Sequence, residues 1–155
     1  MYKISTKLIP DKMDDKKREE ISRRIKSYRS PDAVIAYLFA LLESDVLPTN
    51  DKIIHTAIFE LKKEYPDFFR DFVFSRGDIY PFSKELERVL FRLQQSRILG
   101  TINPTFEFFV FPKKSKEIVL EHFSSKFSHE EKETLSKMSK GLESLLSNQP
   151  ALYRW

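Results

Sequence analysis

The chain contains no cysteine, and it has only three glycines among its 155 residues. Without cysteine there is no disulfide framework, thiolate metal site or cysteine nucleophile, which fits a reducing compartment. The glycines, at positions 77, 100 and 141, are too far apart to form the glycine-rich loop that cradles a phosphate. These two absences exclude the best-known nucleotide-binding motifs, and they leave no reason to expect a cofactor.

Long hydrophobic runs are also missing. The longest one, residues 33–42, has ten residues, whereas a membrane-spanning helix needs about 20. The opening segment, residues 1–7, lacks the apolar stretch of a signal peptide. With 41% hydrophobic and 32% charged residues, the composition is that of a globular protein. We therefore expect a cytoplasmic protein of one domain that has no membrane partner.

Residues that could carry out chemistry are few and poorly spaced. His122 and His129 lie near glutamates, but we expect them on different helices, and no HxxxH or HExxH spacing occurs. His55 falls near the apolar stripe of a predicted helix, so we expect it in the core or at its boundary. A catalytic triad is defined by spatial geometry, which a sequence does not give. The sequence thus predicts no catalytic, cofactor-binding or metal-binding residues, and a protein that is not an enzyme.

Positive charge is concentrated at the N-terminus. Residues 1–30 contain ten Lys and Arg against five Asp and Glu, while the other 125 residues contain seventeen against eighteen. A basic, helix-forming stretch, residues 14–28, includes Arg23 and Arg24. It can be read as an arm that contacts phosphates or simply as the solvated face of a docked helix. The rest of the chain is close to neutral, which weakens any argument from its overall charge to nucleic acid.

The most informative stretch is a predicted helix, residues 83–97, that leads directly into a β-hairpin. Ser83 is placed to cap the helix, and one face is apolar, with spacings of three and four residues, at Leu86, Val89, Leu90 and Leu93. The opposite side, called here the basic face, consists of Lys84, Arg88, Arg92 and Gln95. Phe91 falls beside the basic face rather than in the apolar stripe.

Two strands and a turn follow this helix. Residues 97–102 and 106–111 are rich in β-branched and aromatic side chains, and the turn residues 103–105 lie between them. We expect a mainly α protein with a small antiparallel β-hairpin (α+β), built around a winged-helix core. Its predicted parts are an N-terminal basic arm or helix (1–29), the core (30–114) and a C-terminal helical extension (115–155), all in a single folded unit.

The remaining helices are predicted from their caps. Ser30 and Pro31 should begin a buried helix, Asn50 or Thr49 the next one, and a short helix is expected in the aromatic segment 67–74. About eighteen residues, 65–82, which include that short helix, separate the helix capped by Asn50 or Thr49 from the helix at 83–97, more than the tight turn of a helix-turn-helix allows. Another helix is expected over 115–127, and a capping box opens the last one. The narrow seam on that last helix suggests a homodimer through the C-terminal helix; it consists of Leu135, Met138, Leu142 and Leu145.

The segment Tyr80-Pro81-Phe82-Ser83-Lys84-Glu85-Leu86-Glu87, with Leu90, Leu93 and Ile98-Leu99, resembles the winged-helix core of Panacea-type antitoxin domains. The likeness covers residues 53–146, and Tyr80 stands where that group commonly has glycine. The resemblance implies a small cytoplasmic prokaryotic or phage protein. Such a protein would either neutralise a partner protein or regulate transcription.

Two functions follow from these patterns. In the first, a transcriptional regulator binds double-stranded DNA, with Lys84, Arg88, Arg92 and Gln95 in the major groove and Lys113, Lys114, Arg23 and Arg24 on phosphates. In the alternative, an antitoxin or adaptor binds a partner protein through Phe91, Phe109 and Phe111. The predicted wing tip, residues 103–105, carries no Lys or Arg, which favours the second.

Overall fold

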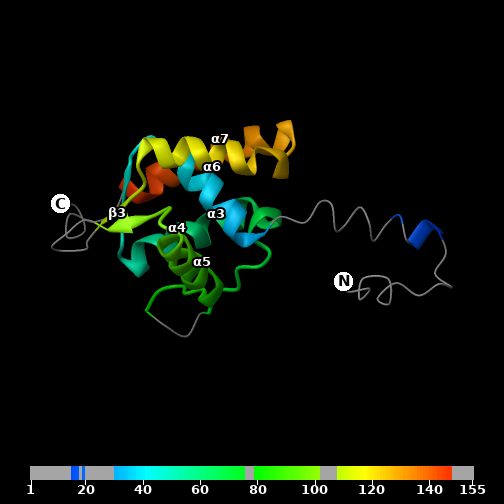
Figure 1. Cartoon of the computed structure of the whole chain (residues 1–155). Helices are drawn as coiled ribbons and strands as arrows, with labels where there is room; N and C mark the ends of the chain where they lie inside the picture. Colours follow the sequence, from blue (N-terminus) through cyan, green and yellow to red (C-terminus); the bar gives the residue numbers. More distant parts are fainter. Residues whose placement is uncertain (1–14, 18, 20–29, 76–78, 102–107, 148–155) are drawn as a thin grey trace, which may run out of the picture.

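The computed structural model describes residues 15–17, 19, 30–75, 79–101 and 108–147 (Figure 1). Those ranges contain mainly helices and one small three-stranded antiparallel sheet, which confirms the α+β class. In chain order the elements from Pro31 onward are α3 (Pro31–Ala40), β1 (Val46–Pro48), α4 (Asp51–Glu64), η1 (Pro66–Phe69), α5 (Lys84–Gln95), β2 (Gly100–Thr101), β3 (Phe108–Val110), α6 (Lys113–Phe123), η2 (Ser124–Lys126) and α7 (His129–Ser147).

Helix α3 lies at the centre of the core. Its start is the predicted one: the Ser30 hydroxyl accepts a hydrogen bond from the Ala33 backbone N–H at 3.1 Å, and Pro31 occupies the first turn. Every residue from Ala33 to Ala40 is buried, as expected for a helix that is apolar all round. Helices α5, α6 and α7 all pack against it.

The sheet has the strand order β1-β3-β2, so β3 lies in the middle. Leu47 pairs with Phe109, and Phe109 pairs with Thr101, and residues directly opposite one another point to the same face. Phe109 is only 5% exposed and Phe111 is fully buried. The prediction that Phe111 contacts a partner is therefore wrong, because its ring is buried in this chain's own core. Phe109 packs in the same core, and only a small part of it is exposed. The predicted wing tip, 103–105, lies outside the described residues.

Helix α5 begins and ends with two different local motifs. Ser83 caps its start by accepting a hydrogen bond from the Leu86 N–H at 3.2 Å, and the predicted apolar stripe is buried throughout. At its end Arg97 has a φ of 64°, a left-handed conformation. The N–H of Ile98 then bonds to the carbonyl of Leu93 and the N–H of Arg97 to that of Gln94, which closes the helix as a Schellman motif. The strand predicted from Arg97 therefore starts only at β2.

Helix α4 and the connection that follows it lead to the start of α5. Asn50 caps α4, since its side-chain oxygen accepts from the N–H groups of Lys52 and Ile53. The helix predicted over 67–74 is shorter than expected and is the 3₁₀ turn η1. The connection then returns through an antiparallel bridge between Ser75 and Phe82. This long path replaces the tight turn of a helix-turn-helix.

Helices α6 and α7 belong to the same hydrophobic core as the rest of the chain. Helix α6 begins at Lys113, before the predicted residue 115, and the capping box at the start of α7 is present, since Ser128 and Glu131 satisfy each other's N–H groups. Leu135, Met138 and Leu142 are buried, and α7 packs on α3 and α4. The seam on α7 is thus used inside the chain, which removes the reason for predicting a homodimer through it.

No helix in these described ranges combines the length and the apolar character that crossing a bilayer requires.

Candidate functional site: the groove beside α5

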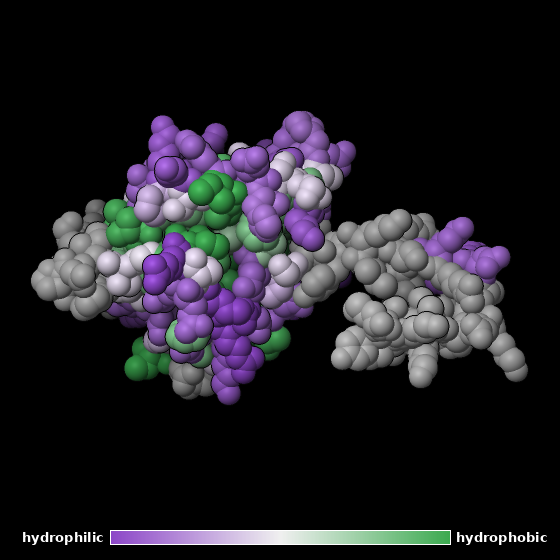
Figure 2. Space-filling model, in the orientation of Figure 1, coloured by the Kyte–Doolittle hydropathy of each residue, from purple (hydrophilic) through white to green (hydrophobic). Residues whose placement is uncertain are grey.

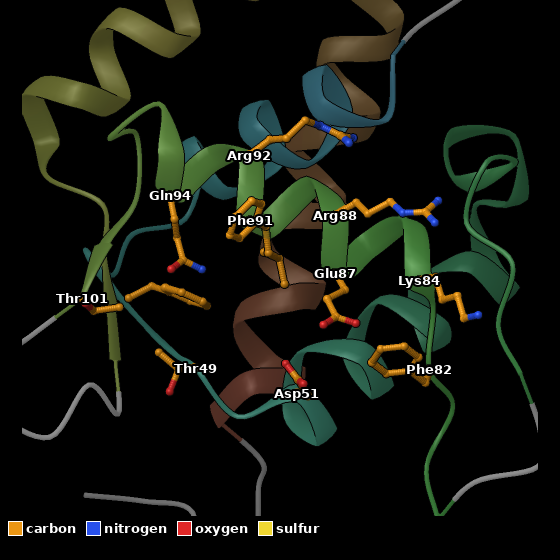
Figure 3. A pocket seen from close by; sticks show the side chains of 12 residues that line it. Thr49, Asp51, Phe82, Lys84, Glu87, Arg88, Phe91, Arg92, Gln94 and Thr101 are labelled. Atoms are coloured by element: carbon orange, nitrogen blue, oxygen red, sulfur yellow. The ribbon is translucent and has the colours of Figure 1, made fainter.

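An open groove of about 740 Å³, called here the α5 groove, runs along the outer side of α5 (Figure 3). Its second wall is the start of α4 with the preceding residue Thr49, and its end is formed by Thr101 of β2 and Phe109 of β3. From α5 itself the lining residues are Lys84, Glu87, Arg88, Leu90, Phe91, Arg92 and Gln94. The helix predicted to be functional therefore borders this groove.

Phe91 is the apolar residue that stands out in this groove. Its side chain is 58% exposed, as predicted from its place beside the basic face. Neighbouring apolar residues of α5, such as Leu90, are buried. Figure 2 shows that hydrophobic residues interrupt the hydrophilic surface on the face that this view presents. An exposed aromatic ring in the middle of a concave site is a typical contact residue.

The basic face is largely occupied by carboxylates of the same chain. The Arg92 guanidinium donates to both oxygens of Asp32, from Nε at 2.8 Å and from Nη2 at 2.6 Å, and its Nη2 also donates to Glu85 at 3.0 Å. The hydrogen bond to Asp32 is the main cause that raises the pKa of Arg92 above its ordinary value. Arg88 lies 3.7 Å from the same Glu85. Arg92 is therefore fixed against the start of α3 and is not free to read a base edge.

The predicted DNA-contacting residues do not all line the groove. Lys84 and Arg88 lie on the rim of the groove, and Figure 3 shows both side chains directed away from the cavity. Gln95 is exposed but does not line the groove; Gln94 does. Lys113 and Lys114 are exposed in the first turn of α6 and do not line the groove either.

Arg23 and Arg24 lie outside the described residues, so the structure says nothing of their position. Of the phenylalanines assigned to a partner, Phe91 and the edge of Phe109 reach the groove, whereas Phe111 does not. Along α5, therefore, the groove is lined both by residues of the basic face and by Phe91, one of the predicted aromatic contacts.

Two carboxylates that sequence reasoning did not assign to the site line the cavity. Glu87 on α5 and Asp51 on α4 point toward one another across the groove in Figure 3. Neither forms an ion pair with any residue that the structure describes. Partial burial raises the pKa of Asp51 above its ordinary value. Glu87 follows Lys84 by three residues, so a helical wheel of α5 places it only at the edge of the basic face. Asp51 belongs to α4, so the same wheel does not include it.

His55 holds the start of α5 from behind the groove. Its Nδ1 accepts a hydrogen bond from the Ser83 N–H at 3.0 Å, and its ring stacks on Phe82, with centroids 4.5 Å apart and planes 8° from parallel. The side chain is fully buried, as the sequence led us to expect, and its Nε2 has no hydrogen-bond partner among the described residues. Burial lowers the pKa of His55 to about 4, partly opposed by the charge of Glu87. The ring is therefore neutral at pH 7, with its proton on Nε2.

The described part of the chain contains no group of three histidine, cysteine, aspartate or glutamate side chains that could hold a metal ion. His129, whose side chain is 86% exposed, pairs with Glu133 at 3.0 Å on the surface of α7. The α5 groove brings together the exposed Phe91, the carboxylates of Asp51 and Glu87 and, at its rim, Lys84 and Arg88.

Comparison of the chain with protein-family models, with curated proteins and with solved structures found no match.

Proposed function

We propose that this protein is a protein-interaction module of winged-helix architecture, such as an antitoxin or adaptor, and that it binds its partner through the α5 groove. The observation that carries the proposal is the 58% exposed Phe91, which lies in the groove on the helix that a winged helix uses for recognition. We propose no catalytic role, and a cytoplasmic location remains the expectation from the sequence.

The order of elements supports a winged-helix architecture. From α3 to β3 the chain runs helix, strand, helix, helix, strand, strand, and the strand order is β1-β3-β2. In this arrangement α5 is the recognition helix and β2 and β3 flank the wing. The resemblance to Panacea-type antitoxin domains over residues 53–146 points to the same architecture.

The charges of the site favour a protein partner over DNA. A helix that enters the major groove has free Arg, Lys, Asn or Gln side chains to read bases. On α5, Arg92 is held by Asp32 and Glu85, and the cavity beside the helix contains the carboxylates of Glu87 and Asp51. Carboxylates at that position would face the phosphates, where a DNA-binding surface is normally basic.

DNA binding is the second candidate, because Lys84 and Arg88 remain exposed on the rim. If α5 enters the major groove, replacing Lys84 and Arg88 by alanine should lower the salt slope of DNA affinity by about two. A slope equal to that of the unchanged protein would remove this rim from the DNA interface.

The proposal is tested by purifying the tagged full-length chain from its native host and identifying the proteins and nucleic acids that accompany it. Phe91→Asp should abolish the retention of a specific protein, because a charge in the centre of the interface leaves the partner's apolar surface unpaired. Val73→Asp is the matched control, since Val73 is 75% exposed and is not among the residues that line the α5 groove. Equal retention by both variants would exclude the groove as the binding site.

A further inference from the structure

We propose that the α5 groove selects a partner segment that presents an arginine or lysine side chain, seated between Phe91 and the carboxylates of Asp51 and Glu87. This inference rests on the proposed function, because it names the chemistry of the partner at the same site. The observation behind it is that the interior and the rim of the groove carry opposite charges.

Apart from Arg92, two carboxylates and two cationic side chains line the groove, and the residues that carry them, Asp51, Glu87, Lys84 and Arg88, are all exposed. Figure 3 shows Glu87 and Asp51 directed into the cavity toward one another, whereas Lys84, Arg88 and Arg92 are directed away from it. Arg92 is neutralised by Asp32 and Glu85, so it does not offset the interior charge. A cationic group entering the cavity meets two carboxylates that have no ion-pair partner among the described residues.

Both carboxylates also lie in the first turn of a helix, Asp51 in α4 and Glu87 in α5, where a negative charge is favourable. Their position at a helix start explains why the two negative charges do not destabilise the fold. It does not explain why the two side chains face each other across a cavity. The desolvation that raises the pKa of Asp51 marks a carboxylate for which no described cation compensates. A bound cation would offset that cost.

The exposed aromatic ring favours a guanidinium or ammonium group rather than a free metal ion. Phe91 lines the groove and is 58% exposed, and the face of an aromatic ring attracts an organic cation. The aliphatic part of an arginine or lysine side chain would cover Phe91, while its charged end would reach Glu87 and Asp51. Thr49 and Thr101 supply further polar groups at the edge.

The test uses the full-length chain, isotopically labelled, and three small probes: N-acetyl-argininamide, N-acetyl-norleucinamide and N-acetyl-glutamamide with a free side-chain carboxylate. Backbone amide shifts of α5 and the start of α4 should saturate with the arginine probe in the millimolar range, more weakly with the norleucine probe, and not with the glutamate probe. In the double variant Asp51→Asn with Glu87→Gln, affinity for the arginine probe should fall about tenfold, as the loss of two exposed ion pairs predicts.

Lys84→Gln is the matched control, because it removes a charge from the rim and leaves the interior intact; its affinity for the arginine probe should be unchanged or higher. An absence of saturable shifts would overturn the inference. It would do so even if the cause were that the chain's own basic N-terminal segment occupies the groove. Equal affinity of the double variant would overturn it as well. If the arginine probe binds but no protein is retained by the tagged chain, the proposed function fails while the cation preference stands.

Discussion

His55 should make the protein less stable as the pH is lowered, because the ring is buried in the folded chain. Its pKa is lowered to about 4 in the folded chain from an ordinary value of 6.5, mainly because the ring is desolvated. Between these two pH values the unfolded chain binds a proton that the folded chain does not. The free energy of unfolding therefore has its full value above pH 6.5 and falls as the pH is lowered toward 4.

The size of the effect follows from the shift. One pKa unit corresponds to about 1.4 kcal/mol, so lowering the pH from 7.5 to 4.5 should remove about 2–3 kcal/mol through His55 alone. The variant His55→Asn keeps an oxygen that can accept from the Ser83 N–H and does not titrate. Urea unfolding, followed by far-ultraviolet circular dichroism at both pH values, should give a pH-dependent loss that is smaller by that amount in the variant.

Comparing the two proteins cancels the contributions of the carboxylates, which titrate in the same window. His122→Asn serves as the control for replacing a histidine, because His122 is exposed on α6. If His55→Asn and the unchanged protein lose the same free energy between pH 7.5 and 4.5, His55 is not a buried neutral residue. The role assigned to it in positioning α5 would then fail as well.

Two further predictions concern stability. Lys116 on α6 is 6% exposed, and its Nζ donates to the carbonyls of Leu42 at 2.7 Å and Ser44 at 2.8 Å while pairing with Asp45 at 2.9 Å. Lys116→Met should therefore lower the free energy of urea unfolding by about 2–3 kcal/mol, against less than about 0.5 kcal/mol for the exposed Lys114→Met; similar values for the two would contradict the contacts described. Arg97 adopts a φ of 64°, which costs a non-glycine residue about 1–2 kcal/mol, so Arg97→Gly should raise the thermal midpoint and Arg97→Ala should leave it nearly unchanged.

Local signals in the sequence predicted most of the helical framework. The caps at Ser30, Asn50 and Ser83 and the capping box at Ser128 are all present, because a cap depends on residues three or four positions apart. The buried stripe of α5 and the exposed Phe91 follow from helical periodicity in the same way. Contacts within one turn of a helix join residues that are close in the sequence, so they can be predicted from the sequence.

The interactions that define the site connect distant parts of the chain, and these could not be predicted. Asp32 and Arg92 are 60 residues apart, and a helical wheel of α5 does not show that Asp32 pairs with this member of the basic face. Likewise, Asp51 faces Glu87 only because the folded chain brings the start of α4 to the groove beside α5. The burial of Lys116 depends on the end of α3, 74 residues earlier.

The burial of Phe109 and Phe111 is different, because a signal for it was present. These residues are two positions apart, so they share one face of a strand, and a face with two phenylalanines usually points to the core. Both are indeed buried. Their assignment to a partner surface came from composition alone, and strand alternation would have corrected it.

The central claim is that the exposed face of α5 at Phe91 contacts another protein. It is tested most directly by replacing Phe91 with the photoreactive residue p-benzoylphenylalanine in the full-length chain, irradiating the native host, and identifying what becomes covalently attached. The account predicts one specific protein adduct from position 91 that is absent when the same residue replaces Val73. Adducts to nucleic acid alone, or the same adducts from both positions, would contradict it.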